Sequence, residues 1–310
     1  MVLDLLKAWF RRGRTVPRDR VTRLPRAVRK STEPQVAAIQ AALDELAALP
    51  GLADIALTKR APKGFYAAAA RFAAAYDAYV EAVAKLMNLG SALRPGTPEG
   101  KSACFEQPIG VTGVEGLLIY REARPWRDFP QVAQNLARLG EAQFKEIQER
   151  HTGKDPEKIA MTSEAVTEGR LAFARRGEPC PLLDPQTGHC RVWALRPQHC
   201  RMHFVVGDPQ RADPRHPEFA KSTVHNIRLP VRQQVALMQL ERRMMLGAAP
   251  FLNANLLQLA QFAEGQTIPE VGEAAPRLGA DGLPAAKANR NRPGAKKFQK
   301  DRARDKRKKK

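Results

Sequence analysis

The stretch FYAAAARFAAAYDAYVEAVAKLMNLG, residues 65–90, is the clearest indication of fold class in this sequence. Its large apolar side chains recur at intervals of 7, 4, 3, 4 and 3 residues, which is the spacing of one face of an α-helix. The members of that face are Phe65, Phe72, Tyr76, Tyr79, Val83 and Leu86. Gly90 follows as a typical helix stop. We therefore predict a long helix that buries an aromatic face in a helical core.

Other parts of the chain have similar helical patterns. The pairs Thr32 with Gln35 and Thr112 with Glu115 match a capping box, in which two side chains satisfy backbone N–H groups at a helix start. With these two, further helices are predicted over residues 32–46, 112–119, 132–147, 155–177, 231–246 and 251–262. Residues 178–206 are interrupted by Pro and Gly and predict an irregular or two-stranded element. The predicted fold class is mostly α, a helical bundle around this small element, with disordered basic termini.

The net charge of +20 is concentrated at the two ends of the chain. Residues 1–30 contain 10 Lys or Arg and 2 Asp or Glu, and residues 285–310 contain 13 and 2. Residues 31–284 contain 29 and 28, so the body is nearly neutral. This distribution argues against a single basic fold and predicts disorder in the polar ends.

The basic ends suggest two kinds of partner. The C-terminal run could bind RNA or another polyanion without sequence specificity through counterion release, or could serve only as a solubilising tail. The N-terminal residues 2–10 could form an amphipathic helix that makes at most a weak, reversible contact with an anionic membrane.

No transmembrane span is predicted, because charged residues interrupt the most apolar stretch, Phe65–Leu89. The first ten residues also lack the features of a secretory signal. We therefore expect a cytoplasmic protein, a compartment in which thiols stay reduced and structural disulfides are rare. Four cysteines there should be free, catalytic or metal-bound.

Cysteine and histidine are concentrated in one short part of the chain. Residues 180–203 contain three of the four cysteines and three of the six histidines. Nine residues separate Cys190 from Cys180 and nine separate it from Cys200, so the chain must fold back to bring the three together. Converging thiolates are the ligands of zinc and of iron–sulfur clusters. The alternative is that these cysteines are small apolar core residues.

The predicted site has four thiolates, with Cys104 joining Cys180, Cys190 and Cys200 from a distant segment. A four-thiolate site is strongly anionic, and nearby cations are expected to stabilise it. Its expected cations are Arg191, Arg196 and Arg201, and its reserve ligands are His199 and His203. The same four thiolates satisfy mononuclear zinc or iron and a 4Fe-4S cluster, so the ligand set does not decide which metal is bound.

The segment CPLLD, then GHCRVWALRPQHCRMHF, over residues 180–204, resembles the zinc- or iron-chelating cysteine-cluster family, also called the CxxCxxCC or YkgJ-like family. The residues that match its signature are Cys180, Pro181, Leu183, Cys190, Trp193, Arg196, Pro197, Cys200 and Arg201. The stretch SACFEQPIGVTGVEGLLI, residues 102–119, resembles the other half of the signature, with Cys104 on its third cysteine and Glu115 on its helix acid.

The N-terminal half of the signature is degenerate, because Pro98, Lys101 and Phe105 stand where the family has cysteines. The resemblance, which covers residues 100–206, implies that one four-cysteine metal site remains and that all cysteines of the chain are used. Some relatives resemble flagellin lysine N-methylases.

Three functions follow. The leading one is a metal-binding protein with a structural or metal-handling site, and no catalytic residue is assigned. The alternatives are an iron–sulfur-dependent enzyme that modifies a protein side chain, and an RNA- or ribosome-associated factor that acts through its basic ends. The chain divides accordingly into a basic N-terminal arm (1–30), a helical region (31–96), a cysteine-cluster metal-binding domain (97–230), closing helices (231–264) and a disordered basic tail (265–310).

Overall fold

The computed structural model describes residues 21–105, 109–151, 164–249 and 251–274, which lie in one compact unit. Their α-helices are α2 (Arg26–Ser31), α3 (Glu33–Ala48), α4 (Ile55–Thr58), α5 (Phe65–Leu86), α6 (Gly113–Ala123), α7 (Phe129–Gln148), α8 (Glu164–Ala174), α9 (Gln198–Arg201), α10 (Val231–Met244) and α11 (Leu252–Phe262). Two antiparallel strands, β1 (His203–Val206) and β2 (Thr223–Asn226), form the sheet of this part of the chain. The prediction of a mostly-α fold is confirmed.

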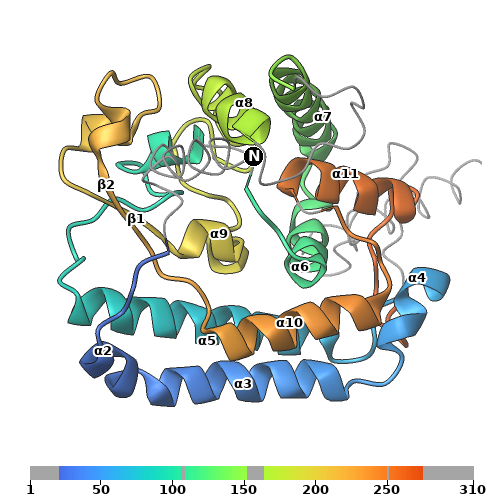
Figure 1. The fold of residues 1–310 in the computed structure, drawn as a ribbon. Coiled ribbons are helices and arrows are strands. Elements are labelled where there is room, and N and C mark those ends of the chain that lie inside the picture. The colour runs from blue at the N-terminus through green and yellow to red at the C-terminus, as the bar shows by residue number, and fades with distance from the viewer. Residues whose placement is uncertain (1–20, 106–108, 152–163, 250, 275–310) are drawn as a thin grey trace, which may run out of the picture. The chain divides into compact units, whose positions relative to one another are not determined.

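Helix α5 lies at the centre of one helical group. Figure 1 shows it running alongside α3 and α10, and it packs against both α3 and α6. The predicted aromatic face is buried in the core, with Phe65, Phe72, Tyr76 and Tyr79 each at most 2% exposed. The exception is Leu86 at the helix end, which is 49% exposed. Helix α5 therefore contributes a close-packed row of aromatic side chains to the core.

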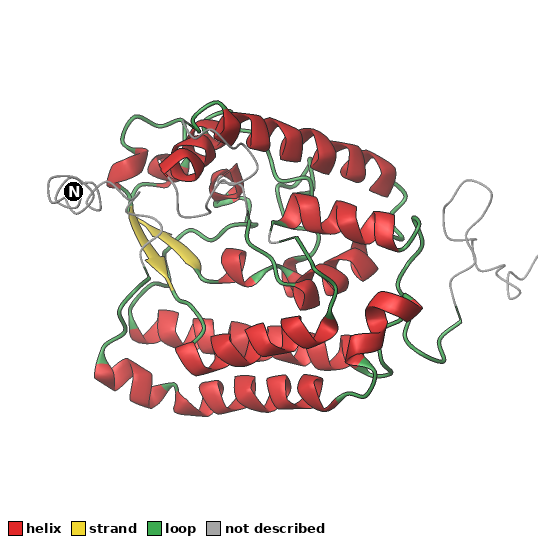
Figure 2. Cartoon of the chain, turned by 45° about the vertical axis from the view of Figure 1, so that its right-hand side comes forward, coloured by secondary structure: helices red, strands yellow, loops and turns green. Residues whose placement is uncertain are grey.

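The second helical group contains α6, α7, α8 and α11. Helix α7 packs against both α8 and α11, and α11 also packs on α6. Figure 2 shows this group stacked over the α3, α5 and α10 group, with the short strands at one side. The helix predicted over residues 155–177 is seen as α8, and its predicted start at Asp155 lies outside the described residues.

The irregular element predicted around residues 180–206 lies between the two groups, where α9 contacts α5. An isolated bridge pairs Leu183 with Cys190, and β1 begins two residues after α9 ends. In the hairpin, His203 pairs with Asn226 and Val206 with Thr223. The two-stranded prediction is thus confirmed, with the second strand further along the chain than expected.

The predictions at the start of the body need correction. Residues 26–31 form α2, so the predicted disorder of the arm is wrong for its last residues, while residues 1–20 lie outside the described part. Thr32 does not form the predicted capping box with Gln35. Its hydroxyl instead donates to the carbonyl oxygens of Val28 (2.9 Å) and Arg29 (3.2 Å) in the preceding helix. The hydroxyl of Thr32 therefore bonds to the end of α2 and does not cap the start of α3.

The predicted disorder from residue 265 onward is also wrong for residues 265–274. This segment returns to the start of α5, where the backbone of Ala61 pairs with that of Pro269 and Val271. The Glu270 carboxylate accepts hydrogen bonds from the backbone N–H groups of Gly64 (2.9 Å) and Tyr66 (3.0 Å). A distant acidic side chain thus caps α5.

Helix α6 begins with the predicted Thr112–Glu115 capping box, which is confirmed. A second carboxylate completes its first turn, because Glu241 on α10 accepts hydrogen bonds from the N–H groups of Gly113 (2.6 Å) and Val114 (3.0 Å). The start of α6 is therefore fixed by α10 as well as by its own residues.

Among the described residues, no single helix is long and apolar enough to cross a membrane. The pair Glu33–Ala48 and Leu52–Thr58, bent by 67°, meets the criteria of length and composition only when both parts are taken together.

Candidate metal centre

The four cysteines come from four separate pieces of the chain. Cys104 lies in a 3-10 turn, Lys101–Phe105, Cys180 follows α8, Cys190 pairs with Leu183, and Cys200 lies on α9. All four are free thiols. Cys104 and Cys180 belong to the main hydrophobic core, and Cys190 and Cys200 pack against it partly exposed.

The thiols influence one another electrostatically, which requires that they lie close together. Burial raises the pKa of Cys104 well above its ordinary value, and the charges of Cys180, Cys200 and Cys190 raise it further. Burial also raises the pKa of Cys180 to about 12, again with a contribution from Cys190. The fold therefore gathers the cysteines predicted as ligands in one region, where unaided ionisation is unfavourable.

Backbone N–H groups face three of the sulfurs. The N–H of Leu182 lowers the pKa of Cys180, and that of Val192 lowers the pKa of Cys190, against the larger effect of burial. In both cases the donor is two residues after the cysteine. The N–H of Gly96 acts in the same way on Cys104. These donors favour the thiolate form of each sulfur.

Two features require glycine at position 96: its backbone conformation and the close approach of Cys190. Its φ of +90° is favourable only for glycine, and a Cβ at this position would lie 2.8 Å from the Cβ of Cys190. Its carbonyl oxygen accepts a hydrogen bond from the Cys190 N–H (2.9 Å). The loop at Gly96 therefore links Cys190 to Cys104.

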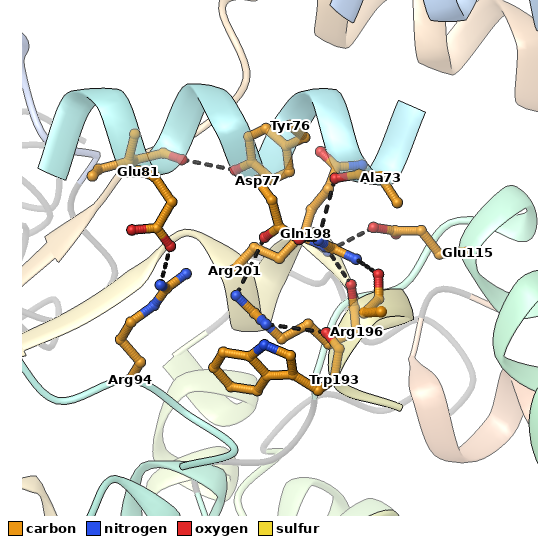
Figure 3. Close-up of polar contacts among 12 residues, drawn as sticks. Ala73, Tyr76, Asp77, Glu81, Arg94, Glu115, Trp193, Arg196, Gln198 and Arg201 are labelled. Atoms are coloured by element: carbon orange, nitrogen blue, oxygen red, sulfur yellow. Dashed lines mark hydrogen bonds and ion pairs between the residues drawn. The ribbon is translucent and has the colours of Figure 1, made fainter. Parts of the chain in front are cut away.

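Arg201 fixes the segment that carries Cys200. Its guanidinium is 1% exposed and ion-pairs with Asp77 on α5 (Figure 3). The same guanidinium donates to three backbone carbonyl oxygens, those of Arg196 (2.6 Å), Ala194 (2.7 Å) and Ala73 (3.2 Å). Each of its nitrogens thus has a partner, and the loop before Cys200 is tied to α5.

Arg196 is the second buried cation. Its guanidinium lies 3.2 Å from the Asp77 carboxylate and stacks 3.5 Å from the centre of the Trp193 ring, as Figure 3 shows. Arg196 and Arg201 both lower the pKa of Cys190, although less than burial raises it. These two residues therefore occupy the cationic positions predicted for them.

The third predicted cation, Arg191, is not at the thiols. It ion-pairs with Asp128 (2.6 Å) and stacks 3.6 Å from the centre of the Trp126 ring. The sequence interval placed it near Cys190, but its side chain extends toward the start of α7. That prediction is wrong.

Glu115 connects the cysteine region to α6. Besides closing its own capping box, it accepts a hydrogen bond from the backbone N–H of Gln198 (2.6 Å), the first residue of α9. Burial raises the pKa of this carboxyl, and the donors Thr112 and Gln198 oppose the rise. The residue therefore positions the helix that bears Cys200.

The two reserve ligands lie next to the thiols. A cavity of about 20 Å³, enough for a water or an ion, is lined by Cys104, Cys200, His199 and His203 together with apolar groups. The Nδ1 atom of His203 lies 2.9 Å from Oδ1 of Asn226, which can only accept, so Nδ1 carries the proton. Burial lowers the pKa of His199 to about 3, and the imidazole is therefore neutral, as a metal ligand must be.

The donor set fits zinc or iron in kind and number, with cysteines, neutral imidazole and N–H donors all present. The described residues do not, however, include three or more His, Cys, Asp or Glu side chains already arranged around one ion position. Metal binding by these residues therefore requires the thiols to turn toward a common point.

A larger cavity lies on the other side of His199. It has a volume of about 640 Å³ and is lined by side chains from α5, α9 and α10, including Tyr76, Gln198 and Gln234, and by Arg228. No local sequence pattern indicates this cavity, because its walls come from segments that are far apart in the chain. His199 separates it from the small cavity and lines both.

Comparisons with protein-family models, with curated proteins and with solved structures find no match to this chain. The function is therefore inferred from the geometry of the described residues.

Proposed function

We propose that this protein binds one zinc or iron centre through Cys104, Cys180, Cys190 and Cys200. The supporting observation is that all four cysteines, which come from four separate segments, lie in or against the same hydrophobic core and near enough to raise one another's pKa. Core packing alone gives no reason to gather them, because a small apolar residue serves equally well at scattered positions.

The surroundings favour an anionic centre. A divalent metal with four thiolates carries two negative charges, and buried charge needs compensation. Arg196 and Arg201 supply cations, and the N–H groups of Gly96, Leu182 and Val192 supply hydrogen bonds to sulfur. When bound, the metal would stabilise thiolates that burial otherwise disfavours, and would connect four segments of the fold.

Anaerobic purification followed by elemental analysis tests the proposal directly. We expect one zinc or iron centre per chain and slow alkylation of the four thiols in the native protein. A metal-free protein whose four thiols all react at once under native conditions would contradict it.

Single substitutions identify the ligands. Cys104→Ser and Cys200→Ser should lower the metal content, whereas the control His216→Ala, at a residue outside the lining of both cavities, should not. His199→Ala and His203→Ala should retain the metal if the set is four thiolates. Loss of metal from either histidine variant, with Cys180→Ser or Cys190→Ser retaining it, would show a mixed cysteine and histidine set instead.

An iron–sulfur-dependent modifying enzyme is the second candidate, and the cavity next to His199 favours it because a side chain could approach the centre there. A brown anaerobic preparation that absorbs near 400 nm is expected for this candidate. A colourless protein with stoichiometric zinc would exclude it.

A further inference from the structure

The cavity of about 640 Å³ is of the size that proteins use for small organic ligands. Much of its wall is aliphatic, formed by Val21, Val111, Met202, Leu229, Val231 and Val235. Val231 is 81% exposed and Val235 is 46% exposed. Part of the apolar wall is therefore exposed to solvent. Exposed apolar surface is unfavourable in water, and an apolar ligand would cover it.

Two charged side chains line this cavity, and only one is available to a ligand. The carboxylate of Glu115 accepts hydrogen bonds from the N–H of Thr112 (3.0 Å), the hydroxyl of Thr112 (2.9 Å) and the N–H of Gln198 (2.6 Å). Its oxygens are therefore already committed to the protein. Arg228, by contrast, is exposed and has no ion pair with any residue that the structure describes.

The position of the Arg228 charge is indicated by Tyr76, at the cavity wall. Burial raises the pKa of Tyr76 well above its ordinary value, and among the opposing charges is that of Arg228. The Tyr76 hydroxyl itself donates to the carbonyl oxygen of Ile227 (2.7 Å), the residue before Arg228. Arg228 therefore lines the cavity close to Tyr76, and Gln234 and Gln198 add neutral polar groups to the same wall.

We propose that this cavity binds a small amphipathic molecule with one anionic head group. The head would pair with the guanidinium of Arg228, and the apolar body would lie along the valine, leucine and methionine side chains. A guanidinium recognises carboxylate and phosphate alike through paired N–H groups, so the shared chemistry is an oxyanion on an alkyl chain. This site does not depend on whether a metal is bound at the cysteines.

Isothermal titration calorimetry of the full-length protein with four eight-carbon probes tests the proposal. The two anions are octanoate and octyl phosphate, and their relative affinities distinguish a carboxylate from a phosphate head. Octanamide is the uncharged comparison and octyltrimethylammonium the cationic one. We expect at least one anion to bind about tenfold more tightly than octanamide, because a charge-assisted contact contributes at least that factor.

Arg228→Gln should weaken binding of the anion about tenfold and leave octanamide unaffected. Arg232→Gln is the matched control, since it removes the same charge from an exposed arginine that lines a different cavity, between α3 and α10. Arg228→Lys should restore part of the affinity. The proposal is overturned if neither anion binds, if the cation binds as tightly as the anions, or if both glutamine variants behave alike.

Discussion

Arg201 is the residue on which the local structure of the candidate centre most depends. It is almost fully buried, and it connects Asp77 on α5 with three carbonyl oxygens. A short side chain at this position would remove one of the two guanidinium groups that contact the partly exposed Asp77 carboxylate, and with it the side-chain donor to three carbonyl groups. The arginine therefore stabilises the fold and also positions Cys200.

Arg201→Ala should lower the free energy of unfolding by roughly 2–3 kcal/mol, because the charge-assisted hydrogen bonds of a buried guanidinium are lost while Asp77 keeps Arg196. Urea denaturation followed by circular dichroism measures this loss. Arg191→Ala is the control, since its pair with Asp128 is partly exposed and should contribute much less. Equal losses in the two variants would contradict the role assigned to Arg201.

At the scale of single residues, the sequence indicates which arginines are candidates for the thiol region but not where their side chains point. Arg196 and Arg201 were predicted beside the thiols and lie there, whereas Arg191, equally close in sequence, points toward α7. Side-chain direction depends on the turn that each residue occupies and on partners such as Asp128 that no local interval reveals.

Helix α6 illustrates how one element is assembled from local and distant residues. Its capping box is encoded within four residues, whereas Glu241 reaches its first two N–H groups from 127 or 128 residues away. Burial raises the pKa of Glu241 above its ordinary value of 4.5, and the N–H groups of Val114 and Gly113 oppose the rise. Between the pKa values of the unfolded and folded states, the folded protein therefore holds a proton at Glu241 that the unfolded chain has released.

This linkage predicts a pH dependence of stability. As the pH rises above about 4.5, the unfolded chain loses its Glu241 proton first, so the free energy of unfolding falls until the folded carboxyl also ionises. Glu241→Gln, which cannot titrate, should flatten this part of the profile measured by urea denaturation. Glu122→Gln, at an exposed position of α6, should keep the wild-type shape; matching profiles for Glu241→Gln and the wild type would refute the linkage.

At the scale of elements, periodicity predicted the helices well because it reflects local geometry. The helix predicted to start at Phe65 does start there, and α7, α10 and α11 lie where the apolar patterns placed them. Thr32 failed as a cap because the preceding residues form α2 and take its hydroxyl. The return of residues 265–274 to α5 depends on contacts across more than 200 residues, which a local pattern does not contain.

For the whole molecule, removal of the proposed metal should reduce stability. A ligand that binds only the folded state stabilises it, and a metal shared by Cys104 and the 180–200 segment connects distant parts of the chain. We expect a chelator to lower the melting temperature, and re-addition of zinc or iron under reducing conditions to restore it. An unchanged melting temperature after verified metal loss would contradict a structural role.

The basic ends make a separate prediction at this scale. Residues 285–310 lie outside the described part of the chain, and their 13 Lys or Arg predict a salt-sensitive interaction with RNA. A chain truncated after residue 284 should lose RNA binding in a filter assay at low salt, while the metal content stays the same. Undiminished binding by the truncated chain would assign RNA contacts, if any, to the body.

The cap that Glu270 forms on α5 also has a consequence for folding during synthesis on the ribosome. Its N–H partners, in Gly64 and Tyr66, leave the ribosome 206 and 204 residues earlier, which is about 10–40 s at ordinary rates of translation. During that interval the central helix lacks its closing carboxylate, and all four cysteines emerge before it arrives. The nascent protein therefore presents its thiols before its body can close.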